Sequence, residues 1–193
     1  EHLLGYYYVQ ELSSCLPVIT LKPFTQNKEE ERFLDLCAAP GSKTTQAASE
    51  MRNTGGVIAN DMSIGRIKIL ASNLERCGAT NTIITKKDGI LFGKELINRE
   101  YEFDKVLIDA PCSGEGTLRS SPRTAIMWNI KTVKGIGGIQ KKLAETAFEL
   151  LRVGGEMIYS TCTHAPEENE AIVNHLLEKY RDKIDESTPP RKA

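Results

Sequence analysis

The sequence lacks several features that would place it quickly in a class of protein. Its 25 basic and 26 acidic residues nearly cancel, so net charge predicts no nucleic-acid partner and any such surface must be a local patch. No apolar run approaches the roughly 20 residues needed to cross a bilayer. The first ten residues also lack the charged start and apolar stretch of a secretory signal. These absences predict a soluble, cytoplasmic protein with no membrane partner.

Cysteine is scarce and irregularly spaced, with five residues and no C-x-x-C pair. An odd number of cysteines separated by wide gaps fits neither a disulfide framework nor a zinc site, so we expect free thiols and no metal. Most free cysteines are small buried hydrophobic residues. This is the interpretation we give to Cys15 and Cys77.

The hydrophobic content of 40% over 193 residues is enough for one core of ordinary size, and we expect a monomer. Short apolar runs alternate with longer helical patterns, which predicts an α/β fold with a mostly parallel sheet covered by helices on both faces. Within a single domain, we expect a helical lead-in over residues 1–30, a doubly wound core over 31–180 and a polar tail over 181–193.

Periodicity and turn residues give the expected elements. Strands are predicted at residues 32–36, 56–60, 81–85, 103–109 and 156–160, and helices at 42–51, 63–77, 140–151 and 166–180. Gly154 and Gly155 are expected to stop the third of these helices. The stretch Tyr6–Leu21 is expected to be helical up to Pro17 and to pack beside the sheet.

The turn after the first strand has the sequence CAAPGSK and comprises Cys37, Ala38, Ala39, Pro40, Gly41, Ser42 and Lys43. In a doubly wound sheet, ligands bind beyond the carboxyl ends of the strands, where the strand order switches, so this turn is expected to meet a cofactor. Small residues let a ligand approach the backbone, and Gly41 can adopt a conformation that a side chain disfavours. The turn lacks the G-x-G-x-x-G spacing that suits a pyrophosphate, which argues against a dinucleotide.

Acidic residues also stand at the ends of the next two strands. Asp61 ends the second strand, where a carboxylate can accept hydrogen bonds from both hydroxyls of a ribose. Asp88 follows the third strand and is placed to reach an adenine. Either aspartate could instead cap a helix, and a glycine-containing turn alone often does no more than that. Three such features on successive strands favour a nucleoside site, to which we also assign Arg66 and Asp109.

A cysteine stands just beyond each of the last two strands. The fourth strand leads into DAPCSGEGT, which contains Cys112, and the fifth leads into STCT, which contains Cys162. If the sheet is wound as predicted, these two loops are neighbours at the edge that carries the cofactor turn. Two thiols are then expected to face one pocket.

The segments LDLCAAPGSKTT, VIANDMS, DAPCSGEGT and YSTCT, in this order, resemble the Sun-type family of RNA cytosine-5 methyltransferases. The similarity runs from about Gly5 to about Tyr180. It implies the Rossmann-like fold of S-adenosylmethionine-dependent methyltransferases, S-adenosylmethionine as the cofactor and RNA as the partner, with 5-methylcytosine as the product. Between RNA classes, we favour tRNA over ribosomal RNA on general resemblance alone. The parts that usually precede and follow this region in the family are not visible, so the chain resembles a fragment.

The resemblance also implies catalytic roles. Carbon 5 of cytosine is too weak a nucleophile to take a methyl group, so a thiolate first adds to carbon 6. The family uses the cysteine of its TC motif for this addition, which is Cys162 here, and assigns the later release of the product to the PC cysteine, Cys112. Asp109, protonated or sharing a proton, is given the neutralisation of charge at ring nitrogen 3, with Lys43 nearby.

A local excess of positive charge points to the RNA surface. Between Thr117 and Ala144 the chain has six basic residues and no acidic one. Here we expect Arg119 and Arg123 to contact RNA and Trp128 to stack on a base, although this tryptophan could instead belong to the core.

Other functions stay open at this point. The first is methylation of ribosomal RNA. A second is a non-catalytic module that binds S-adenosylmethionine or RNA, which retention of both cysteines and Asp109 disfavours. A methyltransferase of DNA or protein is disfavoured by the two cysteine motifs, and an NAD-dependent dehydrogenase by the first turn.

Overall fold

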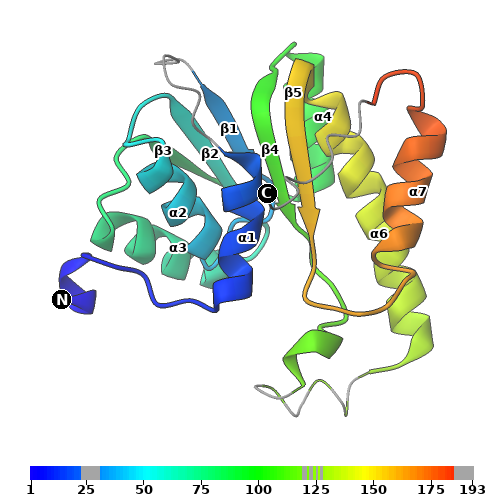
Figure 1. Ribbon diagram of the computed structural model, residues 1–193, viewed down its shortest axis with the longest axis horizontal. Helices are drawn as coiled ribbons and strands as arrows, with labels where there is room; N and C mark the ends of the chain where they lie inside the picture. Colours follow the sequence, from blue (N-terminus) through cyan, green and yellow to red (C-terminus); the bar gives the residue numbers. More distant parts are fainter. Residues whose placement is uncertain (23–30, 119–120, 122–123, 125, 127, 185–193) are drawn as a thin grey trace, which may run out of the picture. The chain divides into compact units, whose positions relative to one another are not determined.

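A computed structural model describes residues 1–22, 31–118, 121, 124, 126 and 128–184, and within these ranges five strands form one parallel sheet (Figure 1). The strands are β1 (Arg32–Asp35), β2 (Gly56–Asp61), β3 (Thr82–Lys86), β4 (Phe103–Asp109) and β5 (Leu151–Ser160). Their order is β3-β2-β1-β4-β5, so the strand order switches between β1 and β4. The predicted α/β fold with a parallel sheet is therefore confirmed.

Helices connect the strands and follow them. They are α1 (Leu12–Leu21), α2 (Ser42–Glu50), α3 (Ile64–Arg76), α4 (Gly89–Asn98), α6 (Ile130–Glu149) and α7 (Glu170–Lys179), with 3-10 turns η1 (His2–Leu4) and η2 (Glu115–Thr117). Figure 1 shows α1 in front of the sheet and α4 behind it. In the described ranges, no helix is long and apolar enough to cross a membrane.

Contacts divide the chain into two compact units. The first comprises residues 1–110 and 146–160 and contains the whole sheet. The second comprises residues 111–145 and 161–193 and contains η2, most of α6 and α7. The predicted lead-in, core and tail of a single domain stay a prediction.

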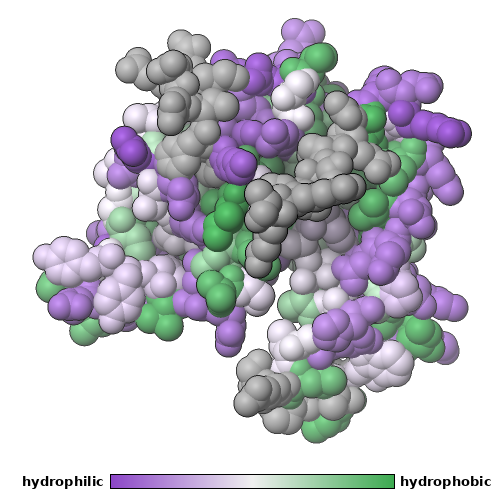
Figure 2. Space-filling view, in the orientation of Figure 1, coloured by the Kyte–Doolittle hydropathy of each residue, from purple (hydrophilic) through white to green (hydrophobic). Residues whose placement is uncertain are grey.

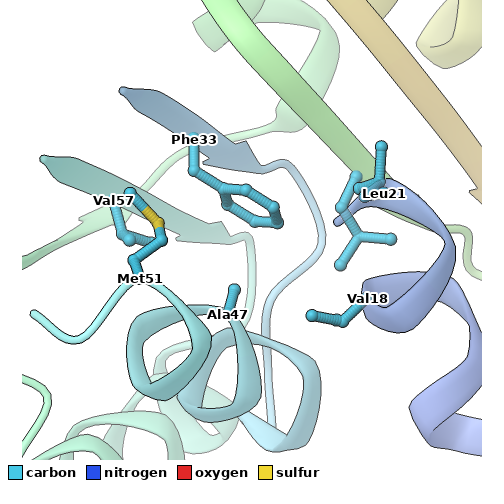
Figure 3. Close-up of a cluster of buried hydrophobic side chains, with 7 residues drawn as sticks. Val18, Leu21, Phe33, Ala47, Met51 and Val57 are labelled. Carbon is cyan, nitrogen blue, oxygen red and sulfur yellow. The ribbon is translucent and has the colours of Figure 1, made fainter. Parts of the chain in front are cut away.

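A cluster of buried apolar side chains fixes α1 and α2 to the sheet (Figure 3). Val18 of α1 and Ala47 of α2 lie against Phe33 of β1, and all three are fully buried. Burial of a side chain such as Phe33 contributes about 1.5–3 kcal/mol. Because the strand before the first turn and the helix after it belong to the same cluster, the turn is anchored at both ends.

The outer face of α1 is apolar. Leu12, Leu16 and Ile19 are all more than half exposed, and Figure 2 shows hydrophobic side chains at the surface where Figure 1 draws this helix. The predicted bounds of α1 were wrong at both ends, because the helix begins at Leu12 and continues past Pro17. Burial of Pro17 and Val18 on the inner face compensates for the backbone hydrogen bond that proline cannot donate.

Other boundaries also differ from prediction. The helix expected at residues 140–151 is α6, which begins ten residues earlier, and β5 begins at Leu151 instead of residue 156. Gly154 and Gly155 do not stop a helix; they lie within β5, where the register with β4 shifts. The last helix begins at Glu170, not Pro166, and α4 was not predicted. The first four strands each lie within one residue of their predicted ends.

Candidate functional site

The first turn is shaped by close packing against α3. Gly41 has a φ of +106°, and a side chain there would place its Cβ 2.8 Å from Cδ1 of Leu70. Ala38 and Ala39 are buried in a cluster with Leu70 and Leu74. The small residues of CAAPGSK therefore let the turn lie directly on α3, in addition to any room they leave for a ligand.

Asp61 joins this turn to the end of β2. Its Oδ2 accepts a hydrogen bond from the Ala39 N–H at 3.3 Å and forms an ion pair with Nη1 of Arg66 at 3.2 Å. Its Oδ1 accepts from the Ser63 N–H at 2.9 Å. Arg66 in turn donates to the Ala39 carbonyl. The structure thus brings together three of the residues predicted to bind the cofactor.

Asp88 has the capping role that the sequence left open as an alternative. Its Oδ1 accepts hydrogen bonds from the N–H groups of Ile90 and Leu91, both at 3.0 Å, and so caps α4. Because Oδ1 already accepts the two capping hydrogen bonds, Oδ2 is the oxygen with which Asp88 would contact an adenine.

Asp109 and Lys43 form an ion pair at the switch point of the sheet. Nζ of Lys43 donates to Oδ2 of Asp109 at 2.6 Å, and Oγ of Ser160 donates to Oδ1 at 2.9 Å. The lysine side chain is 11% exposed and the aspartate side chain 39%. Asp109 therefore has two donors that suit an ionised carboxylate, and Lys43 is the group with which it can share a proton.

A second carboxyl group interacts electrostatically with this ion pair. Asp35, at the end of β1, is 1% exposed, and its Oδ2 accepts from Oγ1 of Thr44 at 2.7 Å. Burial raises the pKa of Asp35 to about 7, with a further contribution from the negative charge of Asp109. Burial also raises the pKa of the neighbouring Cys37 thiol, which the structure therefore keeps protonated.

The two cysteines of the PC and TC motifs lie together in the second unit. Sγ of Cys112 is 3.1 Å from Sγ of Cys162, and the Cys162 N–H donates to the Cys112 sulfur at 3.3 Å. The Cys162 carbonyl accepts from the Gly116 N–H at 2.9 Å. A Cβ on Gly116 would lie only 2.9 Å from that carbonyl oxygen, so glycine is needed for this approach.

The surroundings of the two sulfur atoms differ. Cys162 is exposed, whereas Cys112 is partly buried. The hydrogen bond with Cys162 and burial together raise the pKa of Cys112, which keeps its proton available to the neighbouring sulfur. The pair thus has one protonated, sheltered thiol beside one accessible sulfur that can act as a nucleophile.

Comparison with known proteins identifies the family. A sequence model described as 16S rRNA methyltransferase RsmB/F matches residues 18–191. The chain belongs to this family. The resemblance seen in the four motifs is thereby confirmed.

Individual RsmB/F relatives agree with this assignment. The chain is 47% identical over 184 residues to Ribosomal RNA small subunit methyltransferase F of Vibrio cholerae, covering 95% of this chain and 38% of that protein. The chain thus spans about two fifths of the length of the curated relatives it matches.

Two solved structures from Pyrococcus horikoshii are also similar to the RsmB/F chain. NSun6, solved with SFG, an S-adenosylmethionine analogue, has a TM-score of 0.80 and 32% identity, covering 92% of this chain and 44% of that one. A methyltransferase homolog protein has a TM-score of 0.77 and 38% identity, covering 91% of this chain and 52% of that one.

Of the three residues predicted to bind RNA in this RsmB/F chain, the structure describes one, Trp128. Arg119 and Arg123 lie outside the described residues. Trp128 is 47% exposed, so it is not a core residue, and its indole N–H donates to the Glu115 carboxylate. Among the residues that the structure describes, no group of three or more His, Cys, Asp or Glu side chains is arranged to hold a metal ion.

Two polar side chains near Cys112 were not predicted from the sequence. Gln140 and Glu168 are fully buried and contact the backbone on either side of this cysteine. Glutamine among the apolar positions of an amphipathic helix was the available signal for Gln140. Nothing in the periodicity pointed to Glu168, because its partners are distant in sequence.

Proposed function

We propose that the chain is the catalytic part of an S-adenosylmethionine-dependent methyltransferase that forms 5-methylcytosine in ribosomal RNA of the small subunit. The observation that carries the proposal is the 3.1 Å separation of the Cys112 and Cys162 sulfur atoms. Family membership supports methyl transfer to RNA, and the names of the relatives favour ribosomal RNA. They give no support to our expectation of tRNA, which we replace by the alternative.

The first turn and the ends of β2 and β4 fit the methyl donor. S-adenosylmethionine supplies an electrophilic methyl group on a sulfonium. The buried Asp61 carboxylate is held by backbone donors and Arg66 at the edge of the sheet where doubly wound folds bind nucleosides, and a carboxylate has lone pairs left for ribose hydroxyls. We assign donor binding to this carboxylate, Arg66, Asp88, Asp109 and the turn from Cys37 to Lys43.

Cys162 is the proposed nucleophile. Its thiolate adds to carbon 6 of cytosine, which makes carbon 5 nucleophilic enough to take the methyl group. Negative charge develops at ring nitrogen 3, and we assign its neutralisation to the Lys43–Asp109 pair. Nζ and Oδ2 of this pair are 2.6 Å apart, and the proton between them can be offered to the ring.

Cys112 is the proposed base for release. Its raised pKa has the hydrogen bond with Cys162 as its largest cause, and that bond weakens once the Cys162 sulfur is bonded to carbon 6. Addition of the first cysteine therefore favours ionisation of the second, which gives its proton to solvent. The Cys112 thiolate then takes the proton from carbon 5, the bond between carbon 6 and Cys162 breaks, and the nucleophile is restored as a thiolate. The proton at ring nitrogen 3 returns to the Lys43–Asp109 pair.

The proposal is tested with the full-length protein that contains this chain. Labelled S-adenosylmethionine is supplied with small-subunit ribosomal RNA or tRNA, and the product nucleoside and its position are identified by mass spectrometry. We expect 5-methylcytosine in ribosomal RNA. If tRNA acquires the label and ribosomal RNA does not, the substrate assignment is overturned. If a methylated nucleoside other than 5-methylcytosine is found, the proposed reaction is overturned.

Three cysteine variants test the roles. Cys162→Ser should abolish transfer, whereas Cys112→Ala should leave a protein–RNA adduct that survives denaturation. Cys77→Ser, which changes a free cysteine outside the proposed site, serves as the matched control and should retain activity. Methyl transfer by Cys162→Ser at the normal rate would exclude the covalent mechanism.

A further inference from the structure

Two buried polar side chains form hydrogen bonds with the backbone on both sides of Cys112. Nε2 of Gln140 donates to the Pro111 carbonyl at 2.9 Å, and Oε2 of Glu168 accepts from the Ser113 N–H at 3.0 Å. The two side chains also bond to each other, because Nε2 of Gln140 donates to Oε2 of Glu168 at 2.9 Å. Residues immediately before and after the cysteine are thus tied to one polar pair.

Burial of the Gln140 and Glu168 side chains costs free energy, which their hydrogen bonds to the Cys112 loop offset. Gln140 and Glu168 are both 0% exposed. Burying a carboxyl group and an amide in a core costs several kcal/mol before hydrogen bonds compensate, and apolar side chains of similar volume often give equal or better stability. Packing alone therefore gives little reason for these residue types. The hydrogen bonds to the Pro111 carbonyl and the Ser113 N–H explain why a glutamine and a glutamate stand at these positions.

Further hydrogen bonds tie the Cys112 loop to the Cys162 loop. Oγ of Ser113 and Oγ1 of Thr163 are 2.8 Å apart, so the residues that follow the two cysteines are joined. The Gly116 N–H donates to the Cys162 carbonyl. Because Gln140 and Glu168 hold the other side of the Cys112 loop, movement of the backbone that takes this cysteine away from Cys162 would break several partly buried hydrogen bonds at once.

We infer that Gln140 and Glu168 are positioning residues that hold Cys112 opposite Cys162 for the release step. They touch neither the cytosine nor the methyl donor and act through the backbone of the PC loop. The catalytic part of this inference rests on the proposed function. Displacement of a reacting group by about 1 Å can cost about 100-fold in rate, so a loop held this closely matters for proton removal.

The first test measures the thiol pair without RNA. Hydrogen peroxide oxidises one thiolate to a sulfenic acid with loss of hydroxide, and the second thiol then displaces water to form a disulfide. The rate of Cys112–Cys162 closure, followed by peptide mass spectrometry, reports how closely the sulfur atoms are held. We compare the wild type with Gln140→Met and Glu168→Leu in the full-length protein.

Both variants should slow closure about tenfold, the loss expected for one well-formed hydrogen bond. Glu168→Gln keeps an oxygen acceptor for the Ser113 N–H and should restore most of the rate. The matched control is Glu145→Leu, which removes the contacts of Glu145 with His175 and Lys179. These contacts join α6, which carries Gln140, to α7, which follows Glu168, and their loss should change the closure rate less than twofold. Closure at the wild-type rate in Gln140→Met and Glu168→Leu would overturn the inference.

The second test measures release. Both variants should lower kcat about tenfold and accumulate the covalent protein–RNA adduct that we also expect from Cys112→Ala. Because the adduct accumulates, KM for RNA should fall in proportion and kcat/KM should stay nearly unchanged. A lower kcat without adduct would contradict a role in release. If Cys112→Ala itself gives no adduct, the proposed function fails, while the closure rates still judge the positioning pair.

Folding is checked by thermal melting of each variant. Oε1 of Gln140 has no hydrogen-bond partner among the described residues, so methionine at this position also removes a buried polar atom and should limit the loss of stability. If Glu168→Leu does not fold, Gln140→Met decides the outcome by itself.

Discussion

The buried carboxyl group of Asp35 makes the stability of the first unit depend on pH. Its pKa is about 7 in the folded protein and 3.8 without the fold. Between these values the folded state holds a proton that the unfolded state releases, so the free energy of unfolding falls as pH rises from about 4 to about 7. At about 1.4 kcal/mol for each pKa unit, the total loss is about 4 kcal/mol.

Asp35→Asn should remove this dependence. The asparagine oxygen can still accept from Thr44, and its amide carries no charge to desolvate at any pH. The amide N–H₂ would take the place of Oδ1, which has no hydrogen-bond partner among the described residues, so part of the gain above pH 7 is offset by about 1–3 kcal/mol. Below pH 4 we expect the variant to be less stable than the wild type.

Urea denaturation at a series of pH values measures the effect. The difference in unfolding free energy, wild type minus Asp35→Asn, should fall by about 4 kcal/mol from pH 4 to pH 7 and then level off. Asp88→Asn is the control, because this exposed aspartate caps α4 and asparagine caps equally well. A difference that stays constant with pH, or that rises, would refute the assignment of the raised pKa to Asp35.

Three further substitutions test the packing that supports the site. Gly41→Ala should reduce stability by about 1–3 kcal/mol and weaken S-adenosylmethionine binding in calorimetry, because its Cβ would clash with Leu70 at a positive φ; unchanged affinity would argue against the turn as the donor site. Gly116→Ala should lower methyl transfer with little change in melting temperature, because it pushes on the Cys162 carbonyl; normal activity would show that this loop can yield. Phe33→Ala should cost about 3–5 kcal/mol in urea denaturation, and a loss below 1 kcal/mol would contradict the burial in Figure 3.

Features with a local cause were predicted well. The strands from β1 to β4 have continuous apolar runs bounded by turn residues, so their ends were found to within one residue. The motif cysteines follow β4 and β5 in the chain, so their proximity could be expected from the parallel order of the strands. Prediction of this kind works because each feature is fixed by residues close in sequence.

Features fixed by tertiary contacts were not predicted. Three glycines between residues 135 and 138 weaken the helical pattern of α6, yet packing keeps the helix intact from Ile130. The cap at Asp88 was noted as a possibility, but the helix that it starts was missed. The contact of Glu168 with Ser113 joins residues 55 positions apart, and no periodicity reports such a contact.

The pairing of β5 with β4 is irregular at the start of β5 and regular at its carboxyl end. From Lys105 paired with Glu156 to Asp109 paired with Ser160 the register with β4 is unbroken, whereas the shift near Gly154 takes up extra length at the opposite end of the strand. Val153, beside this shift, is 99% exposed. A short epitope or a fluorophore-labelling sequence inserted after Val153 should therefore be displayed to solvent while the carboxyl ends of β4 and β5 keep their alignment, which offers a handle for single-molecule work on the intact enzyme.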